Sequence, residues 1–373
     1  MFYVTTFDSD PTKSFTNVAY NNIKALQTQK INFELRPLNY ILNWSNKPSW
    51  FLDEDRDYFT KTTASSTPSA LVHLQISDLL KVPYTSKQDS VGMTAIEASG
   101  VPPWICEGLN ESYRGLIVPS DHCKSCLEAS GLRIPIRVVK HALPEMWLKD
   151  YPAPQSKPKA YTFGFVGNWN SRKNPETVLH AYLAAFPEPQ EDIALVLKTF
   201  NAGDIEGYIQ KKCGVPRTDI WVYDESFSEM QMLWLFQMID CYVSPHRGEA
   251  FGLALAQNAA LGKPSLYTGY SAPIEWLSPP HVEIPHTLCK VSESLTQSDF
   301  KFEHVKDMTI EWADVKIDDL AHQMKAAAGS NLRTGFTGQA LSAFRESLSW
   351  SKIGSDLVWA LEDILDRQLE RIN

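Results

Sequence analysis

The sequence predicts two doubly wound α/β domains, and three observations support this prediction. The chain has 373 residues, which is more than one ordinary domain contains. Short apolar segments alternate with helical patterns, as in parallel sheets whose two faces are covered by helices. The alternation stops at a segment rich in Pro and polar residues, 151–159, and then starts again. Hydrophobic residues make up 43% of the chain and charged residues 21%, the balance of a globular rather than a disordered protein.

The first half of the chain opens on an apolar segment, 2–7, that reads as a buried strand. A helical pattern follows and carries the apolar residues Val18, Ile23, Leu26 and Ile31. Further strands are predicted at 33–38, 70–74, 90–96, 115–118 and 134–139. Helical patterns lie between several of them, so this half is expected to form one domain, 1–150.

The second half repeats the same rhythm. The strands are predicted at 161–166, 193–197, 220–223, 241–244 and 264–267, and helices at 174–186 and 228–238, with one more helix between the last two strands. An amphipathic stretch, 353–369, is expected to pack along the outside. We therefore expect a second domain at 151–345 and a separate C-terminal helical segment at 346–373.

Charge and cysteine content limit the possible partners and ligands. The formal net charge is −9, which argues against broad electrostatic capture of nucleic acid or anionic membrane, although a local basic pocket remains possible. No apolar stretch is long enough to span a membrane and the start of the chain lacks a signal-like basic region, so a cytoplasmic protein is expected. The six cysteines are expected to be free thiols. Cys123 and Cys126 have zinc-like spacing, but no second pair completes four ligands, so no metal site is expected.

The most informative segment is 244–264, which reads as a strand, a Gly-containing turn, a helix and a Gly-terminated return. Gly248 and Gly252 allow the backbone to approach a ligand closely, and the start of the helix offers N–H groups and a positive dipole end. Glu249, at the tip of the turn, could accept hydrogen bonds from sugar hydroxyls. Spacing alone leaves two interpretations: a seat for a phosphate-bearing ligand at the carboxyl ends of the strands, or a tight βαβ turn with a surface acid.

This segment resembles the Glu-x7-Glu region of family 4 glycosyltransferases with the GT-B fold. The usual form there is Ser-Pro-Ser-x-x-Glu-Gly-Phe-Gly-Leu-Pro-x-x-Glu-Ala-Met-Ala-x-Gly-x-Pro. The matching residues are Ser244, Pro245, Glu249, Phe251, Gly252, Leu253, Ala259, Gly262 and Pro264. The resemblance implies a retaining, metal-independent hexosyltransferase without a cofactor, whose two Rossmann-like domains face a cleft.

Weaker similarities extend over most of the chain. Residues 165–167 followed by 172–174 resemble the strand and basic loop that open the donor domain of these enzymes. Residues 91–97, 102–104 and 117–120 resemble the acceptor-domain pattern of a subset of them, and 348–350 resemble the Phe-Ser-Trp before the last helix. The resemblance therefore implies an acceptor-side N-terminal domain, a donor domain at 151–345, and a last helix that crosses back to the N-terminal domain.

The resemblance assigns donor-site roles to the motif. Glu249 would hold hydroxyls of the donor sugar, and the backbone N–H groups of Phe251, Gly252 and Leu253 would face the sugar and the phosphates. The second Glu of the motif normally grips the ribose, and here that position is Gln257. Gln offers one acceptor and one donor group instead of a carboxylate, so a weaker or different ribose contact is expected.

Cations for the donor diphosphate are expected in the loop after the strand at 161–166. Lys173 fits the family's Lys, whereas Asn168 stands where the family has Arg, so Arg172 or Arg247 would replace it. Lys198, at a predicted strand end, could add a second positive charge or could be an ordinary exposed lysine. Fixed cations and helix N–H groups would stabilise the departing nucleoside diphosphate.

The acceptor hydroxyl would be guided by the N-terminal domain. Glu97 falls where many relatives place an active-site His, so it could orient or deprotonate the acceptor, or it could be a capping or salt-bridged acid. His73 also ends a predicted strand, where a lone His is more often structural. Residues 9–14 replace the family's first-domain Gly-Gly loop, which leaves acceptor and phosphate contacts from that loop in doubt.

The function expected from these residues is transfer of a sugar from a UDP- or GDP-linked donor to a hydroxyl of a carbohydrate, a lipid-linked glycan or another compound. Three alternatives remain. Asp53 and Asp55 have the Asp-x-Asp spacing of metal-dependent GT-A enzymes, although a solvated loop fits their charged surroundings better. Gln257 and Asn168 would also suit a non-catalytic nucleotide-sugar-binding protein. A glycosyltransferase that modifies a nucleic-acid base is disfavoured by the net charge but not excluded.

Overall fold

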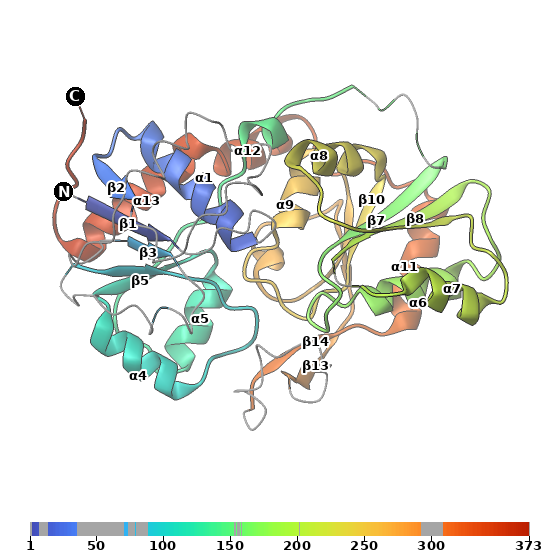
Figure 1. Cartoon of the computed structure of the whole chain (residues 1–373), viewed down its shortest axis with the longest axis horizontal. Coiled ribbons are helices and arrows are strands. Elements are labelled where there is room, and N and C mark those ends of the chain that lie inside the picture. The colour runs from blue at the N-terminus through green and yellow to red at the C-terminus, as the bar shows by residue number, and fades with distance from the viewer. Residues whose placement is uncertain are drawn as a thin grey trace. The chain divides into compact units, whose positions relative to one another are not determined.

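The computed structural model describes residues 2–6, 14–35, 71–73, 79, 89–152, 154, 157, 159–200, 202–291 and 309–372. The chain forms two compact units. The first unit comprises Met1–Leu148, Ser228–Met230 and Phe344–Asn373, and the second comprises Lys149–Phe227 and Gln231–Ala343. Each unit contains a parallel sheet with helices packed against it, which confirms the predicted α/β class (Figure 1).

In the described part of the first unit, six parallel strands form one sheet in the order β2-β1-β3-β4-β5-β6. The strands are β1 (Phe2–Thr6), β2 (Phe33–Leu35), β3 (Leu71–His73), β4 (Val91–Met93), β5 (Gly115–Val118) and β6 (Ile136–Val138). The helices are α1 (Ser14–Thr28), α4 (Pro103–Ser112), α5 (Asp121–Ala129) and the short 3₁₀ helix η2 (Glu145–Leu148). The strand order reverses between β1 and β3, so the carboxyl ends of these two strands mark the switch point of the sheet.

The last helix, α13 (Trp350–Leu365), packs on α1 at the start of the chain. Ile353, Leu357 and Leu361 join the hydrophobic core of the first unit together with residues of α1 and the sheet. A Cβ on Gly354 would lie 2.2 Å from the carbonyl oxygen of Ala25, so only glycine permits this close approach of the two helices. The expected return of the C-terminal helix to the N-terminal domain is therefore present.

The second unit has a parallel sheet in the order β12-β11-β10-β7-β8-β9. The strands are β7 (Tyr161–Val166), β8 (Ile193–Thr199), β9 (Ile220–Asp224), β10 (Cys241–Ser244), β11 (Ser265–Thr268) and β12 (Val282–Ile284), and β13 (Thr287–Lys290) pairs antiparallel with β14 (Glu311–Asp314). The helices are α6 (Pro175–Ala185), α7 (Ile205–Cys213), α8 (Glu229–Met238), α9 (Leu253–Ala260), η3 (Ala272–Glu275), α11 (Ile317–Gly329) and α12 (Gly338–Ser347). The start of α8 and the end of α12 belong to the first unit. In chain order the parallel strands read 3-2-1-4-5-6 from the β9 edge, the Rossmann arrangement, so the switch point lies between β7 and β10.

Several strands are shorter than the sequence predicts. The predicted strand at 90–96 pairs only over β4, and beyond Met93 only the N–H of Thr94 still donates to β5, at the carbonyl of Ile117. The strand predicted at 134–139 is likewise shorter, as β6, whereas residues 36–38 of the strand predicted at 33–38 lie outside the described residues. Apolar residues continue past the last ladder pair because the chain remains buried after it leaves the sheet.

Ion pairs stabilise the second sheet at the amino ends of its strands. Asp240, directly before β10, accepts from the backbone N–H of Thr162 at 2.9 Å and pairs with Lys157 and Arg333. The Asp240 side chain is only 4% exposed, and its charge is compensated by these partners. This network stabilises the edge of the sheet opposite to the one where open α/β sheets bind their ligands.

Candidate functional site

The candidate site lies at the switch point of the second sheet, where β7 and β10 end side by side. The loop from β7 to α6, 167–174, and the loop from β10 to α9, 245–252, both leave the sheet there. Strand order alone therefore brings the two loops together, although residues 175–244 separate them in the sequence. These are the loops in which the sequence placed the phosphate and sugar contacts.

Hydrogen bonds join the two loops to each other. The N–H of Arg247 donates to the carbonyl of Arg172 at 2.8 Å, and Nη1 of Arg172 donates to the carbonyl of Gly248 at 2.8 Å. Asn174, in the left-handed conformation at φ 60°, donates its Nδ2 to the carbonyl of Pro245 at 3.1 Å. Because main-chain atoms of both loops take part, the two loops form one rigid frame.

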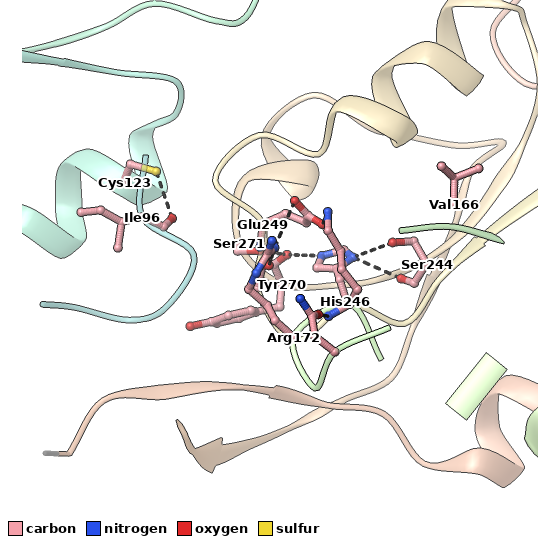
Figure 2. Close-up of polar contacts among 12 residues, drawn as sticks. Ile96, Cys123, Val166, Arg172, Ser244, His246, Glu249, Tyr270 and Ser271 are labelled. Carbon is pink, nitrogen blue, oxygen red and sulfur yellow. Dashed lines mark hydrogen bonds and ion pairs between the residues drawn. The ribbon is translucent and has the colours of Figure 1, made fainter. Parts of the chain in front are cut away.

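Glu249 occupies the centre of this frame and pairs with two cations, one of them Arg172 (Figure 2). Its carboxylate forms an ion pair with the Lys173 ammonium, and its second oxygen lies 3.5 Å from Nη1 of Arg172. Burial would raise the pKa of Glu249, but Lys173 and Arg172 outweigh it and lower this pKa to about 2. The site therefore holds one buried carboxylate and two cations, with a net positive charge among the three.

The main chain of Glu249 is held by the loop that follows β11. The backbone N–H of Glu249 donates to Oγ of Ser271 at 3.0 Å, and the N–H of Ala272 donates to the carbonyl of Glu249 at 3.2 Å. Ser271 has φ 62° and ψ −157°. The sequence analysis did not identify Ser271, and no pattern in the sequence marks it, because a single Ser carries no positional signal.

His246 is a second residue that the sequence analysis did not single out. Its ring is fully buried, with Nδ1 3.1 Å from both the hydroxyl and the carbonyl oxygen of Ser244, and Nε2 3.3 Å from the carbonyl of Tyr270. Burial lowers the pKa of His246 to about 4, against the opposing effect of Glu249, so the imidazole is neutral at pH 7. It stands at a position where the resembled motif has Ser, and that departure was the available signal.

The helix after the loop begins at Gly252. This residue has φ 88° and ψ 61°, a left-handed conformation that favours glycine, and it precedes the first residue of α9. The first N–H groups of a helix have no partner within it, so those of Leu253 and its neighbours lie at the positive end of α9. The ring of Phe251 packs against Trp276 with centroids 5.5 Å apart. Gln257 lies further along α9 and is partly exposed.

Arg247 is engaged in a different direction from Arg172. Its Nε and Nη2 donate to Oδ1 of Asp314 at 3.0 and 2.7 Å, and its Nη1 donates to the carbonyl of Ser171 at 2.5 Å. The carbonyl of Arg247 also accepts from the N–H of Ala313 at 2.8 Å. Arg247 thus ties both site loops to β14, whereas Arg172 is the arginine beside Glu249.

Lys198 ends its strand next to the site loop. The N–H of Gly167 donates to the carbonyl of Lys198 at 3.0 Å. The Lys198 ammonium is buried, donates to the carbonyl of Thr199 at 2.9 Å, and lies 5.1 Å from the ring centroid of Phe227. Burial lowers the pKa of Lys198, against the nearby acids Asp224 and Glu225. Its contacts are thus with Thr199 at the end of β8 and with Phe227.

The sequence placed the acceptor contact in the first unit. Glu97 lies in the loop after β4 and is partly exposed; its neighbour Ile96 accepts a hydrogen bond from Sγ of Cys123 at 3.2 Å (Figure 2). His73 is the last residue of β3 and is 4% exposed. Burial lowers the pKa of His73 to about 4, and burial together with His73 lowers that of His141 to about 3. Both imidazoles are therefore neutral at pH 7.

The described residues contain no group of three or more His, Cys, Asp or Glu that could hold a metal ion. Cys123 and Cys126 lie one turn apart on α5, and burial raises their pKa values to about 12 and about 11. Asp53 and Asp55, and residues 9–13 of the first loop, lie outside the described residues. Within the part of the chain that is described, no helix is long and apolar enough to cross a membrane.

Comparison with known proteins shows what fold this architecture belongs to. No protein-family model matches the chain, and no curated protein matches it. Solved structures do match it. Anabaena HepE in complex with UDP-glucose aligns with a TM-score of 0.68 at 8% identity, over 97% of this chain and 100% of that one.

Two other solved structures agree with this match. Sucrose-phosphate synthase from Thermosynechococcus elongatus aligns with a TM-score of 0.66 at 12% identity, over 98% of this chain and 100% of that one. The lipopolysaccharide outer core galactosyltransferase WaaB aligns with a TM-score of 0.59 at 11% identity, over 97% and 99%. These similarities show that the chain has the GT-B fold.

Proposed function

We propose that this protein is a family 4-like glycosyltransferase that moves a sugar from a nucleotide-activated donor to an acceptor hydroxyl, with retention of configuration and without a metal ion. The observation that carries the proposal is the cluster of Arg172, Lys173 and Glu249 at the switch point of a Rossmann-ordered sheet. Both the position and the charges suit a sugar diphosphate.

The proposed chemistry needs the charges that these residues supply. When the bond between the sugar and the diphosphate breaks, negative charge grows on the leaving phosphate oxygen. Lys173 and Arg172 stabilise that charge, and the N–H groups at the start of α9 add to it. Glu249 stays ionised, because its cations keep its pKa near 2, and it accepts hydrogen bonds from hydroxyls of the donor sugar.

The remaining donor contacts follow the motif. The N–H groups of Phe251, Gly252 and Leu253 face the sugar and phosphates, and Gln257 meets the ribose with one acceptor and one donor group. Arg247 acts through the loops that it ties together. Lys198 adds positive charge near the first of these loops.

The acceptor belongs to the first unit in this proposal. Glu97 orients the acceptor hydroxyl or takes its proton, so the first unit is the acceptor domain and the second unit the donor domain. The acceptor classes to test are carbohydrates, lipid-linked glycans and other hydroxyl compounds. HepE was crystallised with UDP-glucose, which makes a UDP-sugar the first donor to test. The proposed location is the cytoplasm.

The first experiment measures binding and turnover together. A ligand that binds only the folded state raises the melting temperature, so UDP-, GDP- and ADP-sugars are screened by thermal shift, and sugar release or transfer is then followed with each ligand that binds. We expect at least one UDP- or GDP-sugar to bind and to turn over in the presence of EDTA, with the product retaining its anomeric configuration by NMR. Loss of transfer in EDTA, or an inverted product, would contradict those parts of the proposal.

A second candidate is a non-catalytic protein that binds nucleotide sugars. Gln257 and Asn168 motivate it, because both replace charged residues of the resembled motif. Glu249→Ala separates the two functions. If the wild type turns over a nucleotide sugar and Glu249→Ala abolishes this turnover, the protein is an enzyme. If the wild type binds the nucleotide sugar without turnover and Glu249→Ala leaves binding unchanged, the enzyme hypothesis is refuted. Salt-dependent retention on DNA would instead favour a nucleic-acid acceptor.

A further inference from the structure

We propose that Ser271 is a positioning residue that fixes the main chain of Glu249 for donor binding, at the expense of a strained backbone of its own. The inference rests on the proposed function, since it assigns a role within the same donor site. Ser271 lies outside the Glu-x7-Glu motif, in the loop that follows β11.

The hydroxyl of Ser271 contacts Glu249 as well as a residue of its own loop. Its Oγ accepts from the N–H of Glu249 at 3.0 Å and donates to the carbonyl of Tyr270 at 2.7 Å. That carbonyl also lies 3.3 Å from Nε2 of His246. One hydroxyl thus connects the loop after β11 to the loop that carries Glu249 (Figure 2).

The backbone of Ser271 supports a role beyond packing. Its φ of 62° and ψ of −157° lie in a region occupied almost only by glycine, because a Cβ crowds the main chain there. Ser271 is 2% exposed, so the surrounding structure holds it in place. Glycine would adopt this conformation more easily, but glycine has no hydroxyl to accept from Glu249.

Two substitutions separate the strain from the hydroxyl. Ser271→Ala removes the hydroxyl and keeps the Cβ, whereas Ser271→Gly removes both. At ordinary positions the alanine variant is the more stable one, because glycine gains more freedom in the unfolded chain. At Ser271 we expect the reverse order, with a higher melting temperature for Ser271→Gly than for Ser271→Ala.

The donor KM of the two variants should depend on the loss of the Ser271 hydroxyl and not on the melting temperature. Both variants lack the acceptor for the Glu249 N–H, so both should raise the donor KM by a similar factor, about three- to tenfold, the effect of one lost hydrogen bond. A purely structural residue would instead affect KM in proportion to the loss of melting temperature. The assay is donor KM and kcat with the UDP- or GDP-sugar found by the thermal-shift screen, on the full chain.

Ser130 provides a matched control. Its Oγ also accepts a distant backbone N–H, that of Val101 at 3.0 Å, and donates to a carbonyl, that of Cys126 at 2.7 Å, but its φ is an ordinary −83°. Ser130→Ala should be more stable than Ser130→Gly, and neither should change the donor KM. Wild-type protein that binds no nucleotide sugar would overturn the proposed function. Wild-type turnover with unchanged donor KM in both Ser271 variants, or KM values that track melting temperature, would overturn the role of Ser271 alone.

Discussion

Replacing Glu249 with Gln should destabilise the second unit, because the carboxylate compensates two cations inside the protein. Its pKa is lowered from 4.5 to about 2, although burial opposes this. At about 1.4 kcal/mol for each pKa unit, the ionised form is favoured in the folded state by about 3 kcal/mol relative to the unfolded chain. The Glu249 side chain is only 8% exposed, so little of this is lost to solvent screening.

Urea unfolding at pH 7 measures the effect in the transition of the second unit. We expect Glu249→Gln to lower the unfolding free energy by about 3 kcal/mol, since it leaves Lys173 and Arg172 without their carboxylate. The double variant Glu249→Gln/Lys173→Met should recover part of that loss, because one of the two uncompensated cations is gone. Asp356→Asn, which breaks the exposed ion pair with Lys352, is the control, and its effect should stay below about 0.5 kcal/mol.

The pH dependence gives an independent check on the same carboxylate. A folded pKa below the unfolded value means that the stabilisation is complete above pH 4.5 and is lost as the pH falls toward 2. The difference between wild type and Glu249→Gln should therefore shrink over this range. A Gln variant as stable as wild type at pH 7, or a difference that persists at pH 2, would refute the assignment of a buried, charge-compensating carboxylate.

Three further predictions follow from individual contacts. Asp314→Ala should raise the donor KM several-fold while changing the unfolding free energy by less than about 1 kcal/mol, because the half-exposed carboxylate acts by holding Arg247. The control is Asp318→Ala, at the exposed start of α11. Equal donor KM values in the two variants would contradict the prediction. The two ring nitrogens of His281 have no hydrogen-bond partner among the described residues, and burial lowers the pKa of His281 to about 4. Its contribution to stability is therefore complete above pH 6.5 and falls by about 2 kcal/mol at pH 5. His281→Leu should remove that part of the acid sensitivity, measured by urea unfolding at both pH values, and an unchanged loss of stability at pH 5 would count against this prediction. Gly252→Ala should cost about 1–2 kcal/mol in the same assay, because its φ of 88° disfavours a Cβ, and a neutral effect would show that the loop can relax.

The sequence was sufficient to predict the fold. Alternating apolar segments and helices predicted both sheets, because strand burial and helix periodicity are local properties of the chain. The helix predicted at 174–186 is α6, with Asn174 and Phe186 as its flanking caps. The ends of the strands were less predictable: after Met93 the N–H of Thr94 still donates to β5, and the chain then leaves the sheet while Ile96 remains buried. An apolar sequence does not distinguish a buried strand from a buried loop.

Some features of the candidate site could not be predicted from the sequence. Lys173 and Glu249 could be identified from the motif, but the choice between Arg172 and Arg247 depended on side-chain direction, which a sequence does not contain. In the structure Asp314 pairs with Arg247 from β14, a strand outside the motif, whereas Arg172 lies beside Glu249. Ser271 could not be found because its role depends on a backbone conformation that a serine rarely adopts.

The position of α13 has a consequence for how the protein is made. The core of the first unit contains Ile353, Leu357, Leu361 and Ile364, which follow the whole second unit in the sequence. The N-terminal part of the first unit therefore keeps apolar core residues exposed while the whole second unit leaves the ribosome and can fold. Nascent domains usually fold from the N-terminus onward. Here the order is reversed, because the first unit can complete its core only after the second unit has been synthesised.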